Sequence, residues 1–175
     1  MKIQKIDKFN IDQVSQVKSI FYEASVVKNF KSEIHKNDFF NKWCGDYLQY
    51  YSEYFYVLIS NSNVLGYLCG CIDTNNSLEK LIVPGLLNFQ DLYSAYPAHF
   101  HINISSQHRG EGLGQILVKY FIEELIQLKL SGVHIVTSKE ARNVEFYKKL
   151  NFKEIVEREY NQYSQLFMGL SIQIK

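Results

Sequence analysis

The spacing of apolar residues changes along the chain and separates helical from strand-like segments. Over residues 12–28, apolar side chains recur every three or four positions, which predicts a helix. A second helical pattern, rich in aromatic residues, covers residues 37–54. Strand-like runs of β-branched and aromatic residues follow at 54–60 and 64–73, separated by the turn sequence NSN. We therefore expect two helices followed by an antiparallel hairpin.

The same change of period recurs in the rest of the chain. Helical spacing covers residues 112–130 and 141–150, whereas the pattern of residues 74–96 is weak and predicts a loop with a short helix at 87–93. Further strands are expected at residues 2–6, 98–104, 132–138, 152–159 and 164–174. No internal repeat, linker or low-complexity run interrupts this order. The pattern predicts one domain, residues 1–175, with a mixed α/β sheet and helices packed on its faces.

Composition excludes several classes of protein. With 175 residues, of which 46% are apolar, the chain can bury a core and is not of the disordered class. Lys and Arg number 19 and Asp and Glu 18, so no basic excess favours nucleic acid. The N-terminal MKIQKIDKFN lacks the apolar core of a signal peptide, and no stretch approaches the ~20 apolar residues of a membrane span. We expect a cytoplasmic protein that binds neither nucleic acid nor membrane.

The three cysteines, Cys44, Cys69 and Cys71, form no disulfide framework. Their odd number and spacing favour reduced thiols that pack as small apolar side chains. A metal site would need further ligands close by, and the sequence offers none, so we expect no metal.

One segment stands out for its backbone freedom. SSQHRGEGLGQ, residues 105–115, places Gly110, Gly112 and Gly114 between a predicted strand and a predicted helix. Unpaired amides and the helix dipole at such a junction can hold an anion, and glycines let it approach closely. The alternative is a tight turn that binds nothing. A P-loop would need Gly-Lys-Ser/Thr, and the dinucleotide fingerprint would need glycine at Gln115.

The wider stretch INISSQHRGEGLGQILVKYFIEEL resembles the acetyl-CoA-binding motif of the GNAT superfamily of acyl-CoA-dependent N-acetyltransferases. Gln107, Gly110 and Gly112 match the pattern Gln/Arg-x-x-Gly-x-Gly/Ala, and Arg109 and Gly114 occupy commonly used flanking positions. A later stretch, SKEARNVEFYKKLNF, is similar to a second motif of the family. The matching residues there are Asn143, Phe146, Tyr147, Leu150, Asn151 and Phe152.

The sequence departs from the family pattern at three positions. Ser106 stands where many members have Pro, and Asn151 replaces the more usual Gly, although Asn tolerates left-handed backbone. YPAHFHINI resembles a bacterial branch that has Asp where this chain has Asn103, so position 103 offers no carboxylate base.

The resemblance implies a mostly antiparallel central sheet of about six or seven strands, with about four helices on its faces. It also implies acetyl-CoA as cosubstrate, with the pyrophosphate on the loop amides and the pantetheine arm along the preceding strand. The residues that it assigns to the cosubstrate are Ile102, Asn103, Ile104, Gln107, His108, Arg109, Gly110, Glu111, Gly112, Leu113, Gly114, Asn143 and Tyr147.

For catalysis, the resemblance assigns to Tyr147 the acid that protonates the leaving thiolate; the alternative is a packed helix tyrosine. The base is open. His99 and His101 lie two apart on a predicted strand and share a face with Asn103, and histidine shuttles protons near neutral pH. Asp73 and Glu79 are weaker candidates for the base, and the alternative for each is a solvated surface carboxylate. His134, in a predicted central strand, is expected to be a satisfied core residue.

The expected acceptor wall comes from the aromatic helical region. Trp43 and Tyr47, with Tyr50 and with Asn103 from the strand, are candidates to contact the substrate, although helical spacing is also typical of core packing. The favoured reading is transfer of an acetyl or other small acyl group to a primary amine of a small molecule, by direct attack in a ternary complex. A non-catalytic acyl-CoA-binding domain and a protein or peptide N-acetyltransferase are the alternatives. The acceptor, and whether the chain is a monomer or a homodimer, stay open.

Overall fold

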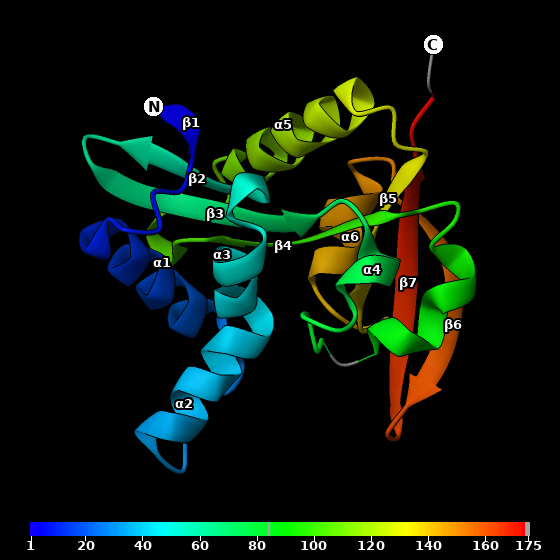
Figure 1. Cartoon of the computed structure of the whole chain (residues 1–175), viewed down its shortest axis with the longest axis horizontal. Helices are drawn as coiled ribbons and strands as arrows, with labels where there is room; N and C mark the ends of the chain where they lie inside the picture. Colours follow the sequence, from blue (N-terminus) through cyan, green and yellow to red (C-terminus); the bar gives the residue numbers. More distant parts are fainter. Residues whose placement is uncertain (84, 174–175) are drawn as a thin grey trace. The chain divides into compact units, whose positions relative to one another are not determined.

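The computed structural model describes residues 1–83 and 85–173 and contains a seven-stranded sheet with the order β1-β2-β3-β4-β5-β7-β6 (Figure 1). Strands β1–β2, β2–β3, β5–β7 and β6–β7 pair antiparallel, whereas β4 and β5 pair parallel. The expected mixed, mostly antiparallel sheet is therefore confirmed. The strands are β1 (Lys2–Lys5), β2 (Phe55–Ser60), β3 (Asn63–Cys71), β4 (Ala98–Ile104), β5 (Gly132–Thr137), β6 (Lys153–Tyr160) and β7 (Tyr163–Ser171).

Six α-helices occur within the described residues, where the family resemblance implied about four. They are α1 (Ile11–Ala24), α2 (Glu33–Phe40), α3 (Asp46–Tyr50), α4 (Thr74–Ser77), α5 (Leu113–Gln127) and α6 (Asn143–Lys148). The difference arises because the predicted helix at 37–54 is two helices joined by a π-helical turn, Asn41–Gly45, and because the one-turn α4 was not predicted. No described helix has the length and apolar character needed to cross a membrane.

Helix starts follow local capping. Asn10 accepts a hydrogen bond from the Gln13 amide at 3.0 Å and begins α1. Ser32 accepts from the His35 amide at 3.1 Å, so helical structure resumes at Glu33, four residues before the predicted start. The predicted strand at 164–174 ends at Ser171, and its residue 174 lies outside the described residues.

The chain divides into two compact units, and strand β4 contributes to both. Unit 1 comprises Met1–Gly70 and His101–Phe121, and unit 2 comprises Cys71–Phe100 and Ile122–Lys175.

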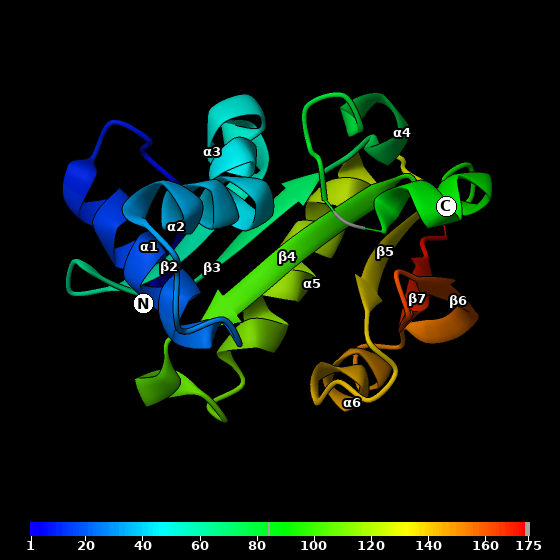
Figure 2. The ribbon, with the colours of Figure 1, turned by 90° about the horizontal axis from the view of Figure 1, so that it is seen from below.

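In unit 1, the β2–β3 hairpin carries apolar side chains on both faces. Its turn uses Asn61 and Ser62 with φ of 47° and 68°, as a tight hairpin requires. On one face, Tyr56 packs edge-on against Tyr120 of α5 at 5.2 Å between ring centroids. On the other, Phe55 stacks on Tyr67 at 5.6 Å. Helices α1 and α3 lie beside β2 and β3 in both views (Figure 1, Figure 2).

In unit 2, a 3₁₀ segment, η3 (Leu86–Leu92), packs aromatic side chains onto strands β5 and β7. Phe89 and Tyr93 form a buried cluster with Phe167, and Tyr93 stacks on His134 at 5.0 Å. His134 is fully buried, and its Nδ1 lies 2.8 Å from the Tyr96 carbonyl oxygen. It is therefore a core residue, as the sequence predicted, but its buried Nε2 makes no hydrogen bond within the described residues, so the ring is not fully satisfied as expected.

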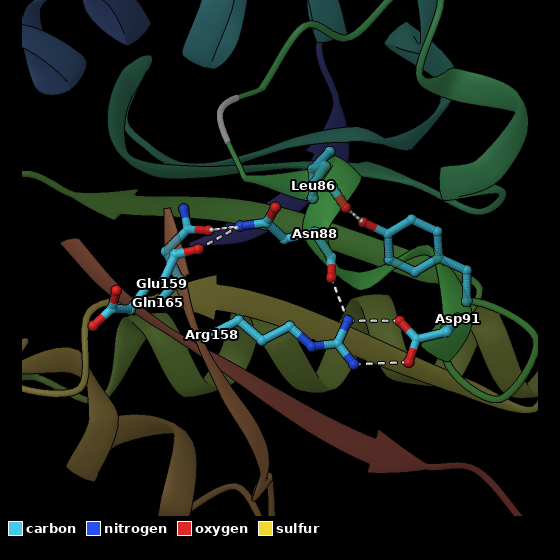
Figure 3. A network of polar contacts seen from close by, with 7 residues as sticks. Leu86, Asn88, Asp91, Arg158, Glu159 and Gln165 are labelled. Carbon is cyan, nitrogen blue, oxygen red and sulfur yellow. Dashed lines mark hydrogen bonds and ion pairs between the residues drawn. The ribbon is translucent and has the colours of Figure 1, made fainter. Parts of the chain in front are cut away.

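A polar network ties the η3 segment to the β6–β7 hairpin (Figure 3). Both terminal nitrogens of Arg158 donate to the Asp91 carboxylate at 2.7 Å, and one also donates to the Asn88 carbonyl. The side-chain amide of Asn88 donates to the Glu159 carbonyl oxygen at 3.3 Å and to the side-chain oxygen of Gln165 at 3.2 Å. The network orders a stretch whose sequence pattern was too weak to predict more than a short helix.

Candidate functional site

The loop between β4 and α5 adopts the conformation that only glycine reaches without strain. Gly110 and Gly112 have φ of 87° and 79°, in the left-handed region. A Cβ placed on either glycine would meet no atom within 4 Å. Backbone conformation, and not crowding, therefore calls for glycine here, and the space in front of the loop is open. Gly114 differs, because it lies buried in the first turn of α5.

Helix α5 begins directly after this loop and directs its free amides toward it. The amides of Gln115 and Ile116 donate to the Gly112 carbonyl at 3.0 and 3.3 Å and close the first turn. Leu113 and Gly114 precede them, at positions whose N–H groups have no acceptor within a helix. The helix dipole adds partial positive charge at the same end, so the junction can bind an anion.

Side chains of the loop are largely exposed. Gln107, Arg109 and Glu111 face solvent, and Arg109 Nε donates to the Ile104 carbonyl at 3.2 Å. His108 Nδ1 lies 3.3 Å from the Glu111 carboxylate. Leu113 is the exception: its side chain is 4% exposed and belongs to the core, so it can offer a ligand only its amide.

The end of β4 lies close against β3. A Cβ at Gly66 would overlap the Ile104 side chain and approach the Asn103 carbonyl oxygen to 2.9 Å. Glycine at position 66 thus permits the two strands to approach each other. Ile102, Asn103 and Ile104 are all half-buried.

The structure brings three of the predicted acceptor-side residues into contact. The His101 ring meets Trp43 and Tyr47 edge-on, at 5.7 and 5.4 Å between ring centroids. Burial lowers the pKa of His101 to about 4, so its imidazole is neutral at neutral pH. Tyr50, 42% exposed, lies at the end of α3.

Asn103 has a partner that sequence reasoning did not single out. Its side-chain amide donates to the hydroxyl oxygen of Tyr67 at 2.7 Å, and Tyr67 is fully buried on β3. Burial, with Cys44 and Cys69 close by, raises the pKa of Tyr67. In the sequence, Tyr67 reads as one more apolar strand residue; only the pairing of β3 with β4 places it beside Asn103.

His99 has different surroundings from His101. It is 2% exposed, its Nδ1 lies 2.6 Å from the Thr74 hydroxyl, and its ring centroid is 5.5 Å from that of His134. Asp73 is exposed and caps α4 by accepting from the Asn76 amide at 3.1 Å, and Glu79 is exposed as well.

Helix α6 positions the second predicted motif. Tyr147 is 5% exposed and packs against Phe100 and Phe152, at 6.0 and 5.6 Å between ring centroids. Burial raises the pKa of Tyr147 above its usual value, which keeps the phenol protonated. Asn143, at the start of α6, accepts from the Thr137 hydroxyl at 2.9 Å. Asn151 has φ of 67°, so it adopts the left-handed turn expected of it.

A glycine loop opening a helix, followed by a buried tyrosine on a later short helix, is the arrangement that the two sequence motifs predict. The family described as "Acetyltransferase (GNAT) domain" matches residues 51–154. The chain belongs to the GNAT acetyltransferase family. The suspected resemblance is confirmed, and so is the class of enzyme, an acyltransferase.

Solved structures support the GNAT fold over nearly the whole chain. SsHAT is 19% identical with a TM-score of 0.75, and the match covers 97% of each chain. Ribosomal-protein-alanine N-acetyltransferase from Brucella melitensis is 15% identical with a TM-score of 0.65, covering 98% of this chain and 100% of that one. A chain of the NatC complex bound to Gag peptide and CoA is 16% identical with a TM-score of 0.62, covering 99% and 100%. No curated protein sequence matches this GNAT chain.

Cys44, Cys69 and Cys71 of this GNAT chain are all buried as thiols. Among the residues that the structure describes, no group of three or more His, Cys, Asp or Glu side chains is arranged to hold a metal ion.

Proposed function

We propose that this GNAT protein is an N-acetyltransferase that moves an acetyl group from acetyl-CoA to the primary amine of a small molecule. The observation that carries the proposal is the left-handed loop at Gly110 and Gly112, which opens α5 with free space in front of it. Amides without an acceptor at a helix start suit a diphosphate, and no atom lies within 4 Å of where a Cβ of Gly110 or Gly112 would be.

In this proposal the CoA diphosphate lies on the amides from Gly110 to Gly114. The exposed side chains of Gln107 and Arg109, with His108 and Glu111, border it. The backbone of Ile102, Asn103 and Ile104 pairs with the pantetheine arm as an added strand would. The family resemblance assigns Asn143, on α6, to the same arm.

The proposed reaction is direct attack of the amine nitrogen on the thioester carbonyl carbon. An N–C bond forms and the C–S bond breaks, while the amine gives its proton to a base or a water molecule and the departing sulfur receives one from Tyr147. Tyr147 is the proposed donor to the departing sulfur, because its raised pKa keeps the phenol protonated at neutral pH, with its O–H available to the thiolate.

His101 is the stronger of the two histidine candidates for contact with the amine. Its imidazole is neutral and lies among Trp43 and Tyr47, the aromatic residues expected to form the acceptor wall. His99 is held by Thr74 in the interior of unit 2, which suits a structural role better.

Peptide acetylation is the second candidate function. It is favoured by the fold similarity to a ribosomal-protein-alanine N-acetyltransferase and to the peptide-bound NatC complex. We favour a small molecule, because the net charge of +1 and the aromatic wall offer nothing specific to a charged polymer.

The test is thiol release from acetyl-CoA with a panel of small primary amines and of peptides with free N-termini. Tyr147→Phe should lower kcat about a hundredfold with CoA affinity unchanged, because only the proton donor is lost. Tyr163→Phe, at a tyrosine that is 75% exposed, is the matched control and should leave both unchanged.

Other outcomes would redirect the assignment. CoA binding without thiol release from any acceptor would favour a non-catalytic acyl-CoA-binding domain. Turnover with peptides alone would establish the second candidate. If CoA gave no thermal stabilisation, the loop would be a structural turn, since a ligand of the folded state must stabilise it.

A further inference from the structure

We propose that Glu23, on α1, is a positioning residue that fixes the start of the glycine loop and thereby strengthens CoA binding. Its two carboxylate oxygens both accept hydrogen bonds from Ser106: one from the backbone amide at 3.1 Å, the other from the side-chain hydroxyl. The two residues are 83 positions apart in the sequence, and both lie in unit 1.

The contact satisfies a donor that the loop itself leaves open. Ser106 is the first residue of a 3₁₀ turn, Ser106–His108, and the first amide of such a turn has no partner within it. A carboxylate is a strong acceptor for that amide, because hydrogen bonds to a charged group are about twice as strong as neutral ones. These two bonds are the main reason that the pKa of Glu23 is lowered, so the side chain is ionised at neutral pH.

Few other hydrogen bonds hold the segment around Ser106. The Ser105 amide donates to the Leu65 carbonyl and the His108 amide to the Ser105 carbonyl, both at 2.9 Å, and Arg109 Nε donates to the Ile104 carbonyl. The His108 ring also lies 3.3 Å from the Glu111 carboxylate. Gly110 and Gly112 come next and have no side chains with which to hold the loop. Bonds that order the segment before Gly110 therefore reduce the entropy that a diphosphate must remove on binding.

A carboxylate near an anion site also repels the anion. Glu23 is exposed, so salt screens this repulsion at distances beyond about 8 Å at physiological ionic strength. The hydrogen bonds to Ser106 are direct contacts and are screened much less. We therefore expect the loss of order to outweigh the relief of repulsion when Glu23 is removed.

The inference rests on the proposed function, and calorimetric titration with CoA at physiological salt tests it. Glu23→Ala should weaken the Kd for CoA about three- to tenfold. Glu53→Ala removes an exposed negative charge elsewhere in unit 1 and should leave the Kd unchanged. If the alanine variant does not fold, Glu23→Gln, which keeps one acceptor oxygen, should give a smaller loss in the same direction.

Ser106→Pro provides a rescue that a merely structural role for Glu23 would not show. Ser105 has φ of −49° and ψ of 138°, a conformation that is allowed before proline. Proline fixes φ near the value of a 3₁₀ residue and has no amide hydrogen that needs a partner. In the Ser106→Pro background, CoA should bind as in the wild type, and adding Glu23→Ala should have no further effect.

Hydrogen exchange separates this inference from the proposed function. In the free protein, the amides of residues 106–112 should exchange faster in Glu23→Ala than in the wild type. Any of three results would overturn the role of Glu23. The first is that Glu23→Ala changes neither the Kd for CoA nor the exchange rates. The others are that Glu23→Ala weakens CoA binding equally in the wild type and in Ser106→Pro, or that Glu53→Ala weakens it as much. If the wild type bound no CoA, the proposed function would fail, and the exchange rates would still decide whether Glu23 orders the loop.

Discussion

Within the part of the chain that the structure describes, two loops contain glycine in the left-handed conformation, and their surroundings are opposite. Gly110 and Gly112 in unit 1 have nothing within 4 Å of where a Cβ would be. Gly85 in unit 2 has φ of 86°, and a Cβ there would overlap the side-chain amide of Gln165. The first loop faces open space, and the second is filled by the protein's own side chains.

The polar groups follow the same division. The residues after Gly85 belong to the polar network around Arg158 (Figure 3). In it Arg158 donates to Asp91, and the side-chain amide of Asn88 donates to Gln165. Before Gly110, the side chains of Gln107 and Arg109 are exposed. A left-handed glycine is therefore not in itself a sign of a binding site. The difference is whether the space beside the glycine is open or is filled by side chains of the protein.

The largest expected effect is a loss of folding stability in acid. It should arise from His101 in unit 1 and not from the polar network of unit 2. Because burial lowers the pKa of His101 to about 4, below pH 6.5 the unfolded chain binds a proton that the folded chain does not. Stability should fall by about 3 kcal/mol between pH 6.5 and 4, at 1.4 kcal/mol for each pKa unit. Urea unfolding at a series of pH values should show this slope in the wild type and not in His101→Gln.

The Asp91–Arg158 pair of unit 2 should respond only at lower pH. Arg158 lowers the pKa of Asp91, so the stability that the pair adds is present above pH 4 and is lost as the pH falls through the lowered pKa. Asp91→Asn should leave the slope between pH 6.5 and 4 intact. A slope that disappeared in Asp91→Asn instead of in His101→Gln would contradict the assignment.

Gly85→Ala should lower stability by about 2–3 kcal/mol. The left-handed conformation costs alanine about 1 kcal/mol, and Gln165 must move and lose its bond to Asn88. Thermal unfolding measures the loss. CoA affinity at a temperature where the variant is folded should equal that of the wild type; weaker binding would mean that the two loops do not differ in function.

Gly112→Ala should show the reverse pattern. The backbone cost is again about 1 kcal/mol, but no side chain is displaced, so stability should fall less than in Gly85→Ala. The amides that point at the diphosphate would shift, and the Kd for CoA should weaken at least about tenfold, which corresponds to about 1.4 kcal/mol. Isothermal titration measures this, and unchanged affinity would remove the loop from the proposed CoA site.

The sequence predicted the regular elements because their apolar period is local. The strands were placed to within two residues, except that β7 ends at Ser171, three residues before its predicted end. The long helix expected over 112–130 is α5, Leu113–Gln127. The short α4 was missed, because its residues Thr74–Ser77 have no apolar period and its cap is Asp73 alone. The split of the helix at 37–54 by a π-turn was missed as well, since spacing does not reveal one extra residue per turn.

The sequence by itself also determined the family and the candidate loop, since the motif glycines lie within five residues of one another and need no distant partner. Only the tertiary structure distinguished His99 from His101, placed Tyr67 on Asn103, and joined Glu23 to Ser106. It also joined Arg158 to Asn88 across 70 residues. Local patterns report the period of the backbone, whereas the partner of a polar side chain depends on which distant segment folding brings beside it.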